Sequence, residues 1–186
     1  MAGPANPGRD ALSQRRHPAH LLLHRPRAAA PERPHQVERQ DAYLRALATL
    51  PGLEIHYGEF RERVKQRPLA SPRPDLPRYV RIRDTEEKGS DVNLATRLLV
   101  GGFTADCEQA VVVSNDSDLA APIRYVNHDL GLRVVVVNPD SRTSTHNDLV
   151  KSATYVKRIW KSHLRNSQLP RTIADAHGLI TKPAAW

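Results

Sequence analysis

Apolar residues first recur at a regular spacing just after residue 36. The spacing is that of one face of a helix, and Pro51-Gly52 ends the pattern. The helix is marked by Val37, Tyr43, Leu44, Leu47 and Leu50. Leu53, Ile55, Tyr57 and Phe60 then predict a strand over about residues 53–60. A proline-rich connection leads to Tyr79-Val80-Arg81-Ile82-Arg83, which reads as a short strand or one arm of a hairpin.

From residue 90 the pattern alternates between helices and buried strands. An apolar stripe predicts a helix over 90–103, with Val92, Ala95, Leu99 and Phe103 on one face. The next helix carries Leu119, Ile123, Val126 and Leu130 and ends at Gly131. Wholly apolar runs at 110–113 and 134–137 predict buried strands, and 155–159 predicts a last one. This order predicts an α/β fold, with a parallel sheet covered on both faces.

Residues 1–36 have a different character. They contain six Pro and no Val, Ile, Phe, Tyr or Trp, so they hold little apolar surface to offset the entropy of ordering. We therefore expect a disordered or aberrant segment over 1–36, a domain over 37–165 and a tail over 166–186 that packs on or near it.

Charge adds little by itself. The net charge of +8 favours a polyanion, but residues 1–36, with six Arg and two acids, supply half of it. The single Cys107 cannot form an internal disulfide, and we expect it to be buried as a small apolar residue. No apolar run is long enough to span a bilayer, and no signal-peptide pattern is present, so the expected location is cytoplasmic and no membrane partner is expected. A homo-oligomer is compatible with the sequence but not indicated by it.

Acidic residues follow the strand at 110–113. Asp116 and Asp118 stand where that strand ends and a helix begins, an edge where α/β sheets bind ligands. Asp91 opens the preceding helix and is expected near the same edge. Such carboxylates suit Mg²⁺ or Mn²⁺. The alternative is that Ser114, Ser117 and Asp118 only cap a helix and shape a turn, and that Asp91 is only an acid at a helix N-terminus.

Two segments together resemble the NYN domain, a branch of the PIN-like nucleases. They are Glu87-Lys88-Gly89-Ser90-Asp91-Val92-Asn93-Leu94-Ala95 and Val112-Val113-Ser114-Asn115-Asp116-Ser117-Asp118-Leu119. The resemblance implies a three-layer α/β/α sandwich with a mostly parallel sheet and metal-dependent cleavage of RNA. It makes Asp91, Asp116 and Asp118 the catalytic and metal-binding residues, with Mg²⁺ or Mn²⁺ as cofactor. Ser114, Asn115 and Ser117 would orient them.

The family begins with an apolar strand that ends in an Asp, and the chain departs from it here. The early triplet Leu21-Leu22-Leu23 is followed by His24-Arg25-Pro26. We therefore expect the first strand and its carboxylate to be missing, with residues 1–36 in place of an authentic N-terminus.

Two other functions compete with a ribonuclease. A catalytically weak or inactive RNA-binding module is the stronger alternative. A phosphatase of the haloacid dehalogenase type would require an Asp-x-Asp-x-Thr motif near the N-terminus, which the sequence lacks. Four basic residues are candidates for RNA contacts, or else belong to a solvated helical face: Lys88, Arg97, Arg124 and Arg133.

Overall fold

A parallel sheet of three strands organises the second half of the chain. In the computed structural model, which describes residues 19–23, 35–71, 74–75 and 77–184, its strands are β5 (Gln109–Val113), β6 (Arg133–Asn138) and β7 (Tyr155–Arg158). Their order is β5-β6-β7, and β6 pairs in parallel with both neighbours. The strands predicted at 110–113, 134–137 and 155–159 are therefore confirmed.

Helices cover one face of this sheet and enclose the core. They are α2 (Ser90–Thr104), α3 (Ala120–Arg124) and α4 (Asn147–Ser152), with a 3-10 turn η1 (Ser117–Leu119) before α3 and a π-helical turn η2 (Tyr125–Asp129) after it. Apolar side chains from these helices and from β5 and β6 pack together into one buried cluster. It contains Leu98, Val112, Leu119, Ile123, Val126, Val134, Val136 and Leu149.

The opposite face of the sheet differs from the prediction. Val111 and Val113 point away from the core, and 57% and 54% of their surfaces are exposed. On the same face, Tyr155 lies opposite Val135 in the register and its hydroxyl reaches Gln109, at 3.3 Å. The expected cover on both faces is therefore wrong for β5. The structure is a mixed α/β fold in which a parallel sheet has one helix-covered face.

A first strand is present, contrary to our expectation. β1 (Ala19–Leu23) pairs in parallel with β2 (Leu53–Tyr57), Leu23 opposite Tyr57. Five consecutive residues without proline suffice to form this ladder, and α2 contacts both strands while α1 (Gln36–Ala48) contacts β2. Among the described strands β1 and β5 are not paired, so the strands form separate sheets. The remainder of the predicted disordered segment lies outside the described residues, apart from 35–36.

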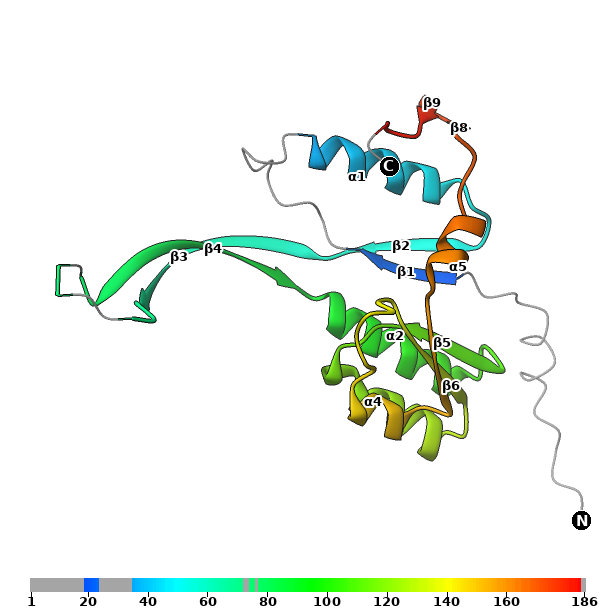
Figure 1. Ribbon diagram of the computed structural model, residues 1–186. Helices are drawn as coiled ribbons and strands as arrows, with labels where there is room; N and C mark the ends of the chain where they lie inside the picture. Colours follow the sequence, from blue (N-terminus) through cyan, green and yellow to red (C-terminus); the bar gives the residue numbers. More distant parts are fainter. Residues whose placement is uncertain (1–18, 24–34, 72–73, 76, 185–186) are drawn as a thin grey trace, which may run out of the picture.

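A long hairpin extends away from these sheets (Figure 1). Its strands are β3 (Glu59–Pro68) and β4 (Tyr79–Lys88), antiparallel over ten residue pairs from Glu59–Lys88 to Pro68–Tyr79. The prediction of a hairpin arm at 79–83 is confirmed, and the arm is longer than predicted. We refer to residues 59–88 as the arm.

The end of the chain packs on α1. After α5 (Lys161–Asn166), β8 (Thr172–Asp175) and β9 (Gly178–Thr181) form a small antiparallel hairpin that contacts α1. Arg45 of α1 holds Asp175 by two hydrogen bonds, of 2.8 and 2.7 Å. These bonds hold the pKa of Asp175 down, at about 2. The predicted tail thus contains strands that its polar sequence did not indicate.

Three side-chain placements differ from the sequence pattern. Val92 and Phe103 are exposed, because α2 turns Leu94, Ala95, Leu98 and Leu99 toward the core instead. Cys107, expected to be buried, is exposed in the turn before β5. None of the described helices is long and apolar enough to cross a membrane.

Candidate active site

The turn after β5 is shaped by its own polar side chains. Ser114 extends the sheet by donating its N–H to the Val137 carbonyl, at 3.1 Å. Its hydroxyl then accepts the Asp116 N–H at 3.1 Å, and Asp116 Oδ1 accepts the Asp118 N–H at 3.0 Å. Asp116 is therefore the N-cap of η1, whereas the capping interpretation named Ser114, Ser117 and Asp118. Both carboxylates remain exposed, so capping does not exclude a second role.

Asn115 ties this turn to the loop that follows β6. Its Nδ2 donates to the Ser144 carbonyl at 3.1 Å, and its Oδ1 accepts the His146 N–H at 2.9 Å. The role expected for Asn115, to orient the neighbouring carboxylates, is compatible with these two bonds. They fix the backbone on both sides of Thr145 against the residue before Asp116.

Asn138 organises the same loop from within and was missed in the sequence. It is fully buried at the end of β6, where its Nδ2 donates to the Thr143 carbonyl at 3.0 Å and its Oδ1 accepts the Asp140 N–H at 2.9 Å. Arg142 forms two side-chain hydrogen bonds to Asp140, which lower the pKa of that carboxyl to about 2. The sequence signal for Asn138 was a polar residue directly after an apolar run, and a similar position pointed to Asn115.

Asp91 lies at the N-terminus of α2. The turn into this helix uses Gly89 in the left-handed region, with φ of 96°, and Asn93 donates its N–H to the Gly89 carbonyl at 2.8 Å. Asp91 is exposed in the first turn, where the helix dipole favours an acid. Residues 105–108 join the end of α2 to the start of β5, and α2 contacts η1, the turn that follows β5.

These carboxylates do not form a ready-made cage. Among the described residues, no group of three or more His, Cys, Asp or Glu side chains is arranged to hold a metal ion. The donor chemistry nevertheless fits Mg²⁺ or Mn²⁺, since Asp116 keeps Oδ2 outside the capping bond and Asp118 is exposed. Mg²⁺ is usually held by one or two carboxylates, with water and substrate phosphates completing its shell.

The four basic candidates are scattered. Lys88 Nζ lies 3.2 Å from Glu86 Oε2, and Arg97 Nη2 lies 3.8 Å from Glu54 Oε2, so both cations are near an acid. Arg133 begins β6, opposite Gln109 at the start of β5, and therefore lies at the other end of these strands from Asp116. Arg124 ends α3, which runs from the carboxylate turn toward that other end. The structure does not bring these four side chains together at the carboxylates.

The structure also contains a hollow, beside the loop that Asn115 holds, which the sequence did not lead us to expect. It has a volume of about 390 Å³ and is lined by Ser144, Thr145, Val150, Val156, Lys157, Arg158 and Trp160. Trp160 is half exposed. The Thr145 hydroxyl is buried and has no hydrogen-bond partner in the part of the chain that the structure describes. The segment Lys157-Arg158-Ile159-Trp160 was the sequence signal for this hollow. Two cations can attract the phosphates of a nucleotide, and a neighbouring aromatic side chain can stack on its base.

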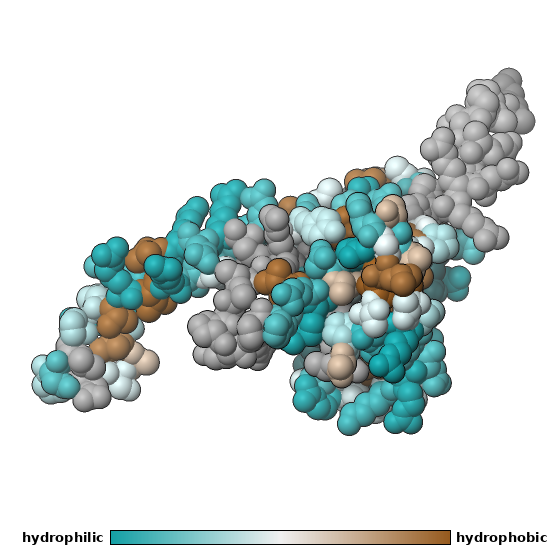
Figure 2. Space-filling model, turned by 90° about the horizontal axis from the view of Figure 1, so that it is seen from above, coloured by the Kyte–Doolittle hydropathy of each residue, from teal (hydrophilic) through white to brown (hydrophobic). Residues whose placement is uncertain are grey.

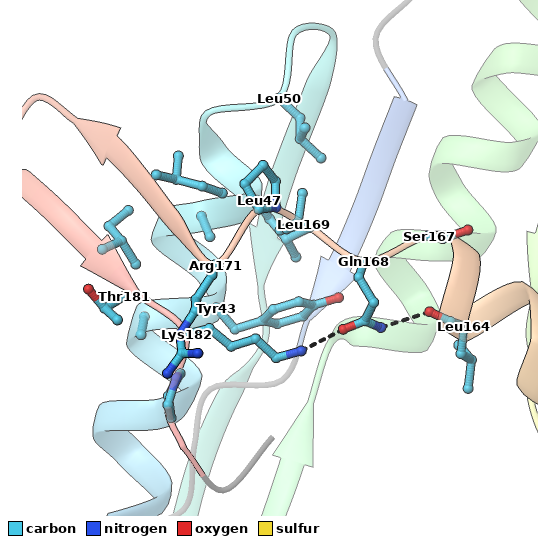
Figure 3. Close-up of a pocket in the computed structure, with 16 residues that line it drawn as sticks. Tyr43, Leu47, Leu50, Leu164, Ser167, Gln168, Leu169, Arg171, Thr181 and Lys182 are labelled. Carbon is cyan, nitrogen blue, oxygen red and sulfur yellow. Dashed lines mark hydrogen bonds between the residues drawn. The ribbon is translucent and has the colours of Figure 1, made fainter.

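A second pocket lies apart from the carboxylates, between α1 and the β8–β9 hairpin (Figure 3). Its volume is about 270 Å³, and one wall is lined by Tyr43 and Leu47 of α1 and by Leu50, which follows that helix. Lys182 donates to Gln168, and Gln168 donates to the Leu164 carbonyl, both at 2.7 Å. No carboxylate lines this pocket, so it does not carry the acid chemistry of the sheet edge.

Comparison with known proteins agrees with the motif at this edge. The family model described as the NYN domain matches residues 40–159. The chain is 35% identical over 112 residues to 6-hydroxy-3-succinoylpyridine 3-monooxygenase HspA of Pseudomonas putida (strain DSM 28022 / S16), a match that covers 59% of this chain and 36% of that protein. A crystal structure of a protein of unknown function from Vibrio parahaemolyticus aligns with a TM-score of 0.43 at 16% identity, over 75% of this chain and 68% of that one. Since the family model spans more than half of the sequence, the chain belongs to the NYN domain family.

Proposed function

We propose that this chain is a metal-dependent ribonuclease that uses Asp91, Asp116 and Asp118. The observation that carries the proposal is that hydrogen bonds join the turn after β5 to the loop after β6. Asn115 holds the carboxylate turn against the loop after β6, and α2, which carries Asp91 in its first turn, contacts η1 directly after Asp116. Membership of the NYN family supports a nuclease-type reaction.

The chain's own residues would divide the work. Asp116 and Asp118 would hold Mg²⁺ or Mn²⁺, with Asp91 as a further acidic ligand and Ser114 and Ser117 orienting the turn. A bound divalent ion would polarise the phosphate and lower the pKa of the attacking water. In the hollow beside the loop, Lys157 and Arg158 would attract the RNA backbone and Trp160 would stack on a base.

Asp116→Asn tests this proposal sharply. Asparagine caps a helix as well as aspartate does, so the turn stays folded while the anionic ligand is lost. We expect cleavage of a labelled single-stranded RNA in Mg²⁺ or Mn²⁺ to fall by a factor on the order of 100 or more. Asp129→Asn is the matched control, because Asp129 is an exposed acid at the end of η2, and this variant should cleave as the parent does. Equal cleavage by the two variants would overturn the proposal.

The competing function is an RNA-binding module with weak or no cleavage. The lack of a three-ligand group among the described residues favours it. His24→Asp separates the two, because it puts a carboxylate directly after β1, where the family carries one. A parent that binds RNA without cleaving it in either metal, beside a cleaving His24→Asp variant, would establish the binding module. The activity named for HspA belongs to a protein of which this chain matches 36%, and no feature described above favours it.

A further inference from the structure

The positive charge of the chain is concentrated in the outer part of the arm. Residues 63–83 contain seven Arg or Lys and one acid, Asp75, so they carry a net charge of +6 in a chain whose total is +8. Residues 37–62 and 84–186 together carry 15 basic and 17 acidic residues, a net charge of −2. The sheets and helices that form the body, with the base of the arm, are therefore slightly acidic. The basic character belongs to the outer arm and to residues 1–36.

Several of these charges are not neutralised inside the arm. Lys65 is paired with Asp84 and Glu86, and Arg67 lies 3.9 Å from Asp84. Four further arginines are exposed and make no ion pair with another described residue. They are Arg63, Arg78, Arg81 and Arg83. Unpaired guanidinium groups on an exposed ladder are suited to phosphate, which they bind through two parallel N–H donors.

One face of the arm adds apolar and aromatic surface to these charges. Side chains of alternate residues share a face, so Tyr79, Arg81 and Arg83 project on the same side of β4, about 6.7 Å apart. In the register Val64 lies opposite Arg83 and Pro68 opposite Tyr79, so both belong to that face. Tyr79 and Val64 are 54% and 56% exposed. An unstacked base can stack on a phenol ring while neighbouring cations hold its phosphate. Bases in a duplex are not available for such stacking.

The arm leads to the candidate active site. Its base is the Glu59–Lys88 pair, which joins the end of β2 on one side to the start of α2 on the other. Lys88 precedes Asp91 by three residues, so an RNA strand that follows the arm to its base would reach the start of α2. Figure 1 shows the arm reaching out from this junction, and Figure 2 shows hydrophilic and hydrophobic surface side by side along it.

We propose that the arm binds single-stranded RNA and guides it to the carboxylate edge, through Tyr79, Arg81 and Arg83. The proposal rests on the proposed action on RNA and names the surface that holds the substrate. A second copy of the chain is the other occupant to consider, since Val64 and Tyr79 are exposed. Two outer arms, each with a charge of +6, repel each other, which favours the polyanion.

The test compares charge variants of the full chain in binding a labelled single-stranded RNA. Combined Arg81→Gln and Arg83→Gln should weaken binding by about tenfold and reduce the slope of log K against log salt by roughly 1.4, since each phosphate that is no longer neutralised removes about 0.7 from the slope. Arg81→Lys and Arg83→Lys together should keep the parental salt slope, because the charges remain, but only part of the affinity, because the paired N–H donors are lost. The matched control removes two exposed arginines outside the arm, by Arg165→Gln and Arg171→Gln, and should bind as the parent does.

Binding and cleavage readouts separate this inference from the proposed function. Asp116→Asn should bind RNA normally and cleave poorly, whereas the arm variant should cleave at the parental kcat with a raised KM. Equal losses of affinity in the arm variant and the control would overturn the arm as the binding surface, even if cleavage depends on Asp116. An arm variant that changes the oligomeric state but not the RNA affinity would assign the arm to a second copy. Tighter binding of duplex than of single-stranded RNA would also contradict the role given to Tyr79.

Discussion

The β5–β6–β7 sheet and the arm are both built of paired β-strands, but they are stabilised differently. The sheet buries Val134, Val136 and Ile123 completely against its helices. In the arm, Val64 and Tyr79 are largely exposed, and the paired acids Asp84 and Glu86 lie toward its base. A two-stranded ribbon without a core is only marginally stable in water. The fold therefore depends on the sheet, and the arm is free to present charged side chains to a partner.

Truncation of the core should give the largest effect in this comparison. Ile123→Ala removes a fully buried side chain from the centre of the core, and we expect the free energy of unfolding to fall by about 2–5 kcal/mol. Val64→Ala on the arm should change it by less than about 0.5 kcal/mol. Urea unfolding followed by circular dichroism measures both. A large loss from Val64→Ala would show that the arm packs against something in solution.

Removal of the Asn115 bridge should have an intermediate effect on stability. Asn115→Ala leaves the Ser144 carbonyl and the His146 N–H without this partner, at a cost of about 1–3 kcal/mol. Asn127→Ala is a matched control. Asn127 also makes two bonds, to the Ser152 carbonyl at 3.0 Å and from the Thr154 hydroxyl at 2.8 Å, but away from the carboxylate turn. We expect similar losses of stability from both variants and a loss of RNA cleavage from Asn115→Ala alone.

The smallest expected effect is on the stability of the fold at acidic pH. Because the hydrogen bonds from Arg45 lower the pKa of Asp175 from 3.8 to about 2, this carboxylate stabilises the folded chain above the unfolded-state pKa. That contribution is lost as the pH falls from about 4 through about 2. Asp175→Asn should therefore lower the unfolding midpoint at neutral pH and approach the parent near pH 2. A difference between the two proteins that does not change over this range would exclude the ion pair as its cause.

The sequence predicted the sheet and the carboxylate turn well, because both are coded locally. Runs such as 110–113 and 134–137 are apolar on both faces of the strand, and Ser114–Asp118 combine turn formers with acids at a strand end. The same local reading failed for α2, where Leu94 and Leu98 rather than Val92 face the core. Helical spacing identifies candidate faces, but the packing partner decides which of them is buried.

Other features depend on contacts between distant residues and could not be predicted in this way. Asn115 is bonded to residues about thirty positions further on, and nothing in either segment specifies the other. β3 alternates Arg and Glu with few apolar residues, so it lacks the pattern of a strand that packs on a core, and its partner β4 defines it instead. β1 was rejected for its composition, although pairing with β2 requires only backbone groups.

The separation of charge between the outer arm and the body also governs how the molecule meets a polyanion. A body near −2 joined to a segment of +6 is an electric dipole, and the field of an RNA chain turns such a dipole before any atoms touch. If the arm binds RNA as proposed, productive collisions would begin at the arm rather than at random over the surface, which would raise the association rate at low ionic strength. Salt removes this advantage over a screening distance of about 8–10 Å. Catalytic efficiency under dilute conditions would therefore depend on diffusion and orientation as much as on the acids.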